Sequence, residues 1–439
     1  MASIDNAYSE GSLPAFEKRT PIHFWGIAGV LYAIVTIYWP RFQEYWPRFQ
    51  EYFPSVFSRL RSFDLFVIIL LFLTLFKAMY RREPFYQKDS GILLSLCLIL
   101  VARLLSVAFS PHFSPDLFLS VGTFVEAFVV CSVFISLIGT RFRRSVVLTL
   151  VLITLFETMI GAGQFISSGG NAHGVGIASL RGVGELQILL ALWGLIAFCE
   201  NAGNKILNIL MFVVGAAGVF IAYLTTAYVQ LLVAVIVGYF LLVKRVKRKY
   251  GWTVIIVSVI AIALFLLSDV HLPLATWEYH SLITRTGSVG FRVVLWKGAL
   301  VAFASSPIVG VGSGVFGREQ LAYLEYANVW FKEGYSLRQG FSAHNTVLGF
   351  LAETGLVGLA AYITYAVATI KAAFRVSRIA PTVFHKALAA TVVSGIVLDI
   401  VAGSSFQPIT MTLVALLASY DIEYRIVRQR IGPLIADDN

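Results

Sequence analysis

Charged residues are scarce in this sequence. Only 13% of its 439 residues are charged, whereas 58% are hydrophobic, and the mean hydropathy is +0.79. Because soluble globular domains carry about 25% charged residues, the composition excludes an ordinary soluble protein. Apolar runs of about 20 residues recur along the chain, and each is long enough to cross a hydrocarbon layer about 30 Å thick. We therefore predict an all-α fold, a polytopic transmembrane helical bundle.

Cysteine and metal-binding motifs are also sparse. The three cysteines, Cys97, Cys131 and Cys199, all lie inside apolar runs, so a disulfide framework is not expected. There is no C-x-x-C, no H-E-x-x-H and no paired histidine spacing. We therefore predict no metal site and no cofactor. The first apolar run begins near Ile22 without a following small-residue cleavage site, so no cleavable signal peptide is expected.

Basic residues exceed acidic ones by 34 to 24, which gives a formal net charge of +10. They stand in short clusters between apolar runs, as membrane topology signals do, so nucleic acid is not expected as a partner. The apolar runs predict about twelve spans, at 22–39, 62–80, 91–109, 117–139, 145–166, 185–200, 206–223, 226–243, 252–269, 346–370, 387–403 and 407–423.

The distribution of basic residues predicts the orientation. With the N-terminus in the cytoplasm, 22 of the 34 basic residues fall on the cytoplasmic side and 11 on the other side, with Arg103 inside a span. This excess follows the positive-inside rule. We expect a cytoplasmic tail and spans one to nine over 1–269, and one large, partly helical periplasmic loop over 270–345. Spans ten to twelve follow over 346–424, and a second cytoplasmic tail over 425–439.

The long polar stretch from Thr284 to Gly358 is the candidate active centre. It begins with Arg285 and Arg292, continues through the turn P-I-V-G-V-G-S-G from Pro307, and reaches S-A-H-N, with His344, before an apolar helix. The two arginines are seven residues apart, so on a helix they would face the same way.

The location of this stretch limits the chemistry. Outside the cell there are no nucleotides, so an activated donor must arrive attached to a lipid, such as a polyprenyl pyrophosphate. Charge that develops on a leaving pyrophosphate can be neutralised by a metal ion or by fixed cations. The loop lacks clustered carboxylates and D-x-D, so the expected cations are Arg285 and Arg292, since guanidinium groups bind phosphate in a two-pronged fork. The alternative is that both arginines lie on a solvated surface without a ligand.

His344 is the candidate base. An imidazole with a pKa of about 6.5 can assist removal of a proton from an incoming sugar hydroxyl. Ser342 or Asn345 could cap the following helix, whose N-terminus also favours anions. Glu353, nine residues later, falls on the opposite face of the helix, where packing or capping is expected. The alternative for His344 itself is a structural histidine.

Two further groups of polar residues need an explanation. The glycine-rich loop before the sixth predicted span carries Arg181, and it is either a flexible turn or a backbone that approaches a ligand. Charges inside the predicted spans are costly in lipid, so each must face a partner or water. The charged residues inside the predicted spans are Arg103, Glu126, Glu157 and Asp399. Their expected role is pairing within the bundle, and the alternative is an ion relay.

The order of these motifs resembles a known family. R-x-x-x-W from Arg292, the P-I-V-G-V-G-S-G turn and S-A-H-N-T-V-L-G-F-L-A-E-T-G-L-V-G-L are similar to the O-antigen ligase and polymerase superfamily, over about 285–370. The resemblance implies a GT-C-like membrane glycosyltransferase. It implies His344 and Arg292 as catalytic residues, and Arg285, Arg181 and Asn345 as pyrophosphate contacts. Tyr228 stands where the family often has another arginine, and it is included as a pyrophosphate contact. The alternative is that Arg285 or Arg181 provides that contact instead.

The resemblance also implies substrates and location. The donor would be a glycan on undecaprenyl pyrophosphate, and the acceptor a sugar hydroxyl of lipid A-core at the periplasmic side of the bacterial inner membrane, among membrane lipids. Transfer would be metal-independent and inverting, in lipopolysaccharide biosynthesis. A polymerase that uses a second lipid-linked repeat as acceptor is the alternative. A lipid-linked oligosaccharide transporter is a third possibility, which predicts charges across a central cavity.

Overall fold

The computed structural model describes twelve stretches of the chain, and its helices are all α-helices. The described residues are 22–50, 62–81, 90–114, 117–138, 140–168, 184–222, 225–242, 286–319, 322–323, 342–379, 382–402 and 407–436. No strand occurs among them. Their helices are α2 (Ile22–Gln50), α3 (Ser62–Arg81), α4 (Gly91–Ala108), α5 (Leu117–Ser136), α6 (Phe142–Ser167), α7 (Gly184–Cys199), α8 (Lys205–Ala222), α9 (Thr225–Leu242), α12 (Thr286–Ser305), α13 (Val315–Arg318), α15 (Thr346–Ile379), α16 (Val383–Ala402) and α17 (Pro408–Ala436).

The predicted spans coincide with helices wherever the structure describes them. The span predicted at 252–269 lies outside the described residues, and each of the others overlaps one helix. Three helices within the described part of the chain are long and apolar enough to cross a membrane: Gly91–Ala108, Phe142–Ser167 and Thr346–Arg378. The all-helical fold is therefore confirmed, whereas the number of twelve spans, the periplasmic loop and the domain boundaries stay predictions.

Some helix ends differ from the prediction. α2 continues past 39 to Gln50, through Pro40 and Pro47. α4 instead starts at Gly91, as predicted, one residue after Ser90, whose hydroxyl accepts a hydrogen bond from Leu93 N at 3.2 Å, as an N-cap does. Within the predicted 270–345 loop, a regular 20-residue helix, α12, carries Arg292.

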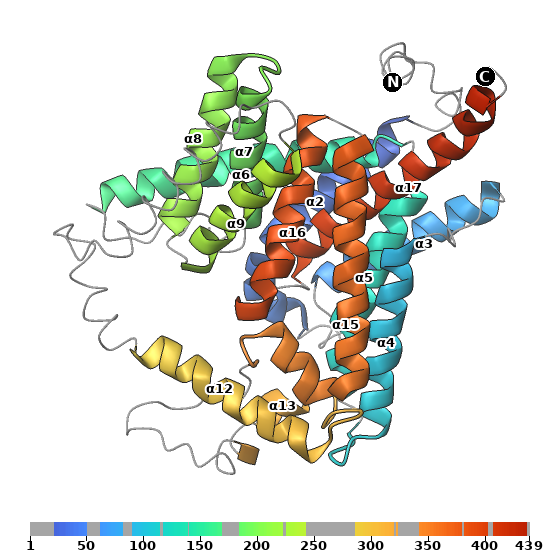
Figure 1. The fold of residues 1–439 in the computed structure, drawn as a ribbon, viewed down its shortest axis with the longest axis vertical. Helices are drawn as coiled ribbons and strands as arrows, with labels where there is room; N and C mark the ends of the chain where they lie inside the picture. Colours follow the sequence, from blue (N-terminus) through green and yellow to red (C-terminus); the bar gives the residue numbers. More distant parts are fainter. Residues whose placement is uncertain are drawn as a thin grey trace.

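The helices form a bundle with α12 and α13 across one end (Figure 1). α4 packs between α5 and the long part of α15, and α16 lies on the other side of α15, against α7 and α9. α7 pairs closely with α8, and α2 with α6. Both α12 and α13 pack against α15. A second, smaller hydrophobic core at this end joins α4, α5, α12 and the start of α15, and includes Val107, Leu117, Ala299, Val311 and Ala352.

Several ion pairs tie the helices together at the other end of α15. Asp421 on α17 binds Arg375 at 2.6 Å and Arg425 at 2.8 Å. Arg143 on α6 binds Glu423 at 2.8 Å. Arg375 lies twenty residues after the start of the long part of α15, a helical distance of roughly 30 Å, so these pairs are remote from α12.

Candidate active site at the break in α15

α15 consists of two helical pieces that meet at a sharp break. Gly355 has φ 62° and ψ −157°, a conformation essentially restricted to glycine, and the residues on either side of it are helical. The shorter piece, residues 346–354, leads back to His344. We refer to residues 342–354 as the arm. Figure 1 shows the arm turning away from the long upright part of α15 toward α12.

The turn that follows α12 is inserted into this break. In an unbroken helix, the N–H groups of Leu356 and Val357 would donate to the carbonyls of Ala352 and Glu353. Here all four groups bond to residues 306–314, which we call the inserted turn. Val311 N donates to Ala352 O at 3.0 Å and Gly312 N to Glu353 O at 3.1 Å, while Leu356 N and Val357 N donate to Pro307 O at 2.9 Å and Ile308 O at 3.2 Å. Two intrahelical bonds are thus replaced by four bonds between segments.

Glycine is required where these two backbones touch. A Cβ at Gly355 would lie 2.7 Å from Gly310 N and closer still to the Ile308 carbonyl. A Cβ at Gly310 would overlap the Glu353–Thr354 peptide in the same way. The glycines of P-I-V-G-V-G-S-G and E-T-G therefore serve one purpose, which is the close approach of the inserted turn to the break.

A buried arginine joins the break to α4 and α5. Arg103, which is 5% exposed, forms an ion pair with the Glu353 carboxylate and donates to Ser313 Oγ at 3.2 Å. Its guanidinium carbon lies 4.4 Å from the centre of the Phe124 ring and 4.5 Å from that of Phe350. The predicted pairing of Arg103 within the bundle is thereby confirmed, and its partner is the glutamate for which packing or capping was expected.

Three serines extend this network through the backbone. Ser106 on α4 donates to the Glu353 carbonyl, and Ser110 donates to Val311 O at 2.6 Å. Ser120 Oγ on α5 lies 2.8 Å from Ser313 Oγ. Each hydroxyl satisfies an atom of the break or of the inserted turn, so α4 and α5 fix both segments at once.

His344 stands near the N-terminal end of the arm. Its φ of 46° places it in the left-handed region, which a non-glycine residue seldom adopts and which recurs at functional sites. The turn is held by its neighbours: His344 N donates to Ser342 Oγ at 3.4 Å, and Asn345 Oδ1 accepts from Leu348 N at 2.9 Å. Asn345 is therefore the N-cap of α15, as one of the two sequence alternatives predicts.

Arg292 on α12 acts on His344 electrostatically. Burial lowers the pKa of the half-buried His344 imidazole below its usual value, and the positive charge of Arg292 lowers the pKa further. The tertiary structure thus brings together two predicted residues that lie 52 positions apart. Because a lowered pKa keeps the imidazole neutral at neutral pH, His344 is in the state that accepts a proton.

Three further residues are predicted as phosphate contacts: Tyr228, Arg181 and Arg285. Tyr228 is buried in α9, where its hydroxyl donates to Phe220 O of α8 at 2.8 Å, so a phosphate contact would have to replace that bond. Arg181 and Arg285 lie outside the described residues, and their roles stay predictions. Trp296, one turn after Arg292, has a buried indole N–H without a hydrogen-bond partner among the described residues.

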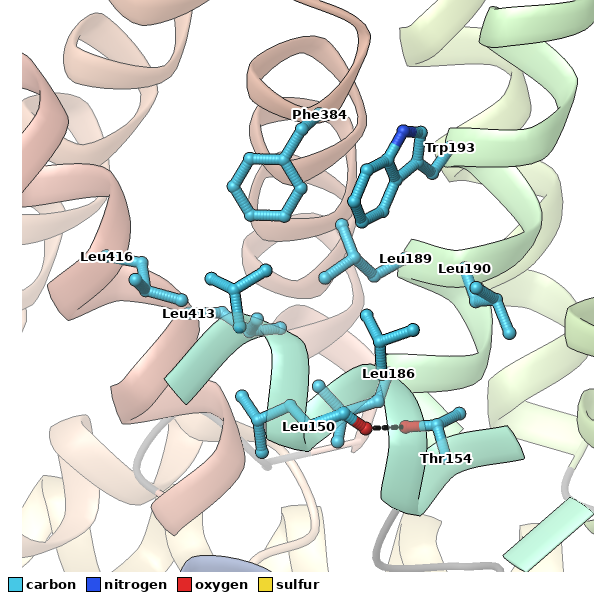
Figure 2. A pocket seen from close by; sticks show the side chains of 11 residues that line it. Leu150, Thr154, Leu186, Leu189, Leu190, Trp193, Phe384, Leu413 and Leu416 are labelled. Carbon is cyan, nitrogen blue, oxygen red and sulfur yellow. Dashed lines mark hydrogen bonds between the residues drawn. The ribbon is translucent and has the colours of Figure 1, made fainter. Parts of the chain in front are cut away.

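A crevice between α6, α7, α16 and α17 has the wrong chemistry for this site. Figure 2 shows its lining of leucines, with Trp193 and Phe384. Its polar side-chain atoms are the hydroxyl of Thr154, which donates to Leu150 O at 2.7 Å, and the indole N–H of Trp193. The crevice therefore holds no charged side chain that would neutralise a phosphate and none that would transfer a proton.

Sequence reasoning did not find the network around the break. Arg103 and Glu353 are 250 positions apart, and the backbone groups that the inserted turn and the break pair are 41 to 49 positions apart. Two signals were present: a lone arginine in an apolar run, and two glycine motifs in one polar stretch. Neither signal specifies a partner.

A comparison with known protein families finds a match that includes the arm and α12. Residues 210–363 match a family model described as O-antigen ligase. This segment contains α9, α12, α13 and the arm, and thus Tyr228, Arg285, Arg292, His344 and Asn345, whereas Arg181 lies before it. No curated protein matches the chain. The resemblance expected from the sequence is therefore confirmed over residues 210–363, which match the O-antigen ligase family model.

Proposed function

We propose that this protein is an O-antigen ligase of the bacterial inner membrane. In this proposal it transfers a glycan from undecaprenyl pyrophosphate to a sugar hydroxyl of lipid A-core at the periplasmic face, in lipopolysaccharide biosynthesis. The proposal is carried by the half-buried position of His344 at the N-terminus of α15, where burial and the charge of Arg292 both lower the pKa of the imidazole. The family match over both residues supports it.

The two residues have complementary roles in this reaction. His344 accepts the proton of the acceptor hydroxyl as its oxygen attacks the anomeric carbon. The bond from that carbon to the pyrophosphate oxygen breaks, and the leaving pyrophosphate keeps the electron pair. Arg292 neutralises the charge that develops there, with Arg285 and Arg181 as further cations. Attack from the side opposite the leaving group inverts the anomeric centre.

The same arginines give a reason to expect metal-independent transfer. Guanidinium groups remain protonated at any physiological pH and bind phosphate oxygens in a fixed geometry, so they can provide the stabilisation that a divalent cation provides in other transferases. The N-terminus of α15, capped by Asn345, adds a partial positive charge at the same place.

A reconstituted transfer assay tests the proposal. Purified protein is incubated in chelator with lipid-linked glycan and either lipid A-core or a second lipid-linked repeat. We expect product on lipid A-core, and none from His344→Ala or Arg292→Ala. Lys297→Ala, which removes an exposed cation from the same helix, is the matched control and keeps activity.

Other outcomes would contradict particular parts of the proposal. Product only on the second lipid-linked repeat would make the protein a polymerase. A strict requirement for added magnesium would contradict the role of the arginines, and full activity in either site variant would contradict the mechanism.

A further inference from the structure

α15 is kinked at Gly355, and the arrangement to compare with it is a straight helix through the same residues. In the straight arrangement, the Ala352 and Glu353 carbonyls would accept from Leu356 and Val357 within the helix. In the kinked arrangement, the inserted turn satisfies all four groups. The straight arrangement would leave two N–H groups and two carbonyls of the inserted turn without these partners, so backbone hydrogen bonding favours the kinked form. Side-chain contacts can stabilise the kinked form further.

The ion pair of Arg103 with Glu353 is the contact placed to do this. Glu353 lies in the last turn of the arm, two residues before the break, and Arg103 belongs to α4, which packs along α15. Arg103 also holds Ser313 of the inserted turn and is enclosed by Phe124 and by Phe350 of the arm. One side chain thus binds the arm, the inserted turn and the bundle.

We propose that Arg103 and Glu353 are positioning residues that hold the arm in its kinked arrangement and thereby keep His344 beside Arg292. The inference rests on the proposed function, in which those two residues act together. Neither Arg103 nor Glu353 touches substrate in this scheme. They act through the orientation of the arm.

The geometry makes His344 sensitive to this orientation. The helical part of the arm has nine residues and spans roughly 14 Å at 1.5 Å per residue. A rotation of about 10° at Gly355 therefore moves the His344 end by roughly 2 Å, from the rise per residue. A misplacement of about 1 Å can lower a catalytic rate by about a hundredfold.

The chain provides a matched control for the ion pair. Arg143 on α6 pairs with Glu423 at 2.8 Å, donates to Ser419 Oγ at 3.3 Å and lies 4.7 Å from the centre of the Tyr420 ring. It has the same kinds of partners as Arg103 (a glutamate, a serine and an aromatic ring), but it lies at the other end of the bundle. Glu423→Gln therefore removes a comparable pair without touching the arm.

The test compares Glu353→Gln with Glu423→Gln in the transfer assay across a pH series. For Glu353→Gln we expect kcat to fall by about ten- to a hundredfold, with a smaller change in KM for the donor. The acid limb of its pH–rate profile should move to higher pH, because His344 is then farther from the positive charge of Arg292. Glu423→Gln should leave the acid limb in place.

A double variant separates positioning from stability. Arg103→Met together with Glu353→Gln removes both charges, so no unpaired charge stays buried and thermal stability should recover relative to either single variant. The acid limb should remain shifted, because the arm is still not held. Recovery of both stability and the wild-type pH profile would overturn the inference.

A measurement that does not depend on catalysis distinguishes this inference from the proposed function. In a variant without native cysteines, two spin labels report the position of the arm. One is attached at Gly349→Cys in the arm, where a Cβ meets nothing within 4 Å, and the other at Leu94→Cys on α4, where the side chain is exposed. Glu353→Gln should broaden or shift the distance distribution, and Glu423→Gln should not. An unchanged distribution with Glu353→Gln would refute the inference even if His344→Ala proved inactive.

Discussion

Replacement of Gly355 by alanine is the most direct perturbation of the candidate site that leaves its polar side chains intact. Alanine has to adopt φ 62° and ψ −157°, a conformation that costs a non-glycine residue about 1–3 kcal/mol. Its Cβ also overlaps backbone atoms of Ile308 and Gly310, which cannot move aside as a side chain can. Overpacking of this kind costs about 1–3 kcal/mol.

These costs exceed what backbone hydrogen bonding contributes to the kinked form. The inserted turn provides two more backbone hydrogen bonds than a straight helix would, which together contribute about 1–3 kcal/mol. The combined strain and overlap of about 2–6 kcal/mol is larger. We therefore expect Gly355→Ala to detach the inserted turn from the break and to misplace the arm, with a loss of transfer of at least about tenfold.

Gly349→Ala is the control within the same arm. A Cβ there meets no atom within 4 Å, and the residue is helical, so alanine should be neutral or stabilise the helix by about 0.5–1 kcal/mol. Both variants are measured by thermal unfolding in detergent and by the transfer assay. Wild-type turnover and stability in Gly355→Ala would refute the argument that the break requires glycine.

Two further predictions concern the end of the arm. Asn345→Ala removes the N-cap bond to Leu348 N and should lower stability by about 0.5–2 kcal/mol in thermal unfolding, whereas Asn345→Asp keeps an acceptor and should retain most of it. Arg292→Gln removes a charge that lowers the pKa of His344, so that pKa should rise in the folded protein. Because His344 has to be neutral to accept a proton, the acid limb of residual activity should move to higher pH. The shift should be partial, since burial, the larger cause, remains, and an unchanged limb would contradict the proximity of Arg292 and His344.

Most helices follow from the composition of each segment. Continuous apolar runs such as the one in α4 have to satisfy their backbone groups internally in lipid, and a helix does so within a single segment. The candidate residues also follow from local chemistry, because arginines that precede a glycine turn and a histidine before a helix differ from the apolar sequence around them. Arg292 and His344 could therefore be selected, although not shown to be neighbours, from the sequence alone.

The tertiary structure decided how those residues are held. The kink at Gly355 exists because four backbone groups find partners in a turn 41 to 49 positions earlier, and no local periodicity encodes that choice. Arg103 had to pair with something, since an isolated charge in an apolar interior is costly. Its pairing with Glu353, 250 positions away, depends on the packing of α4 against α15. Residue types are a local property of the chain, whereas the identity of a partner depends on which segments the fold brings into contact.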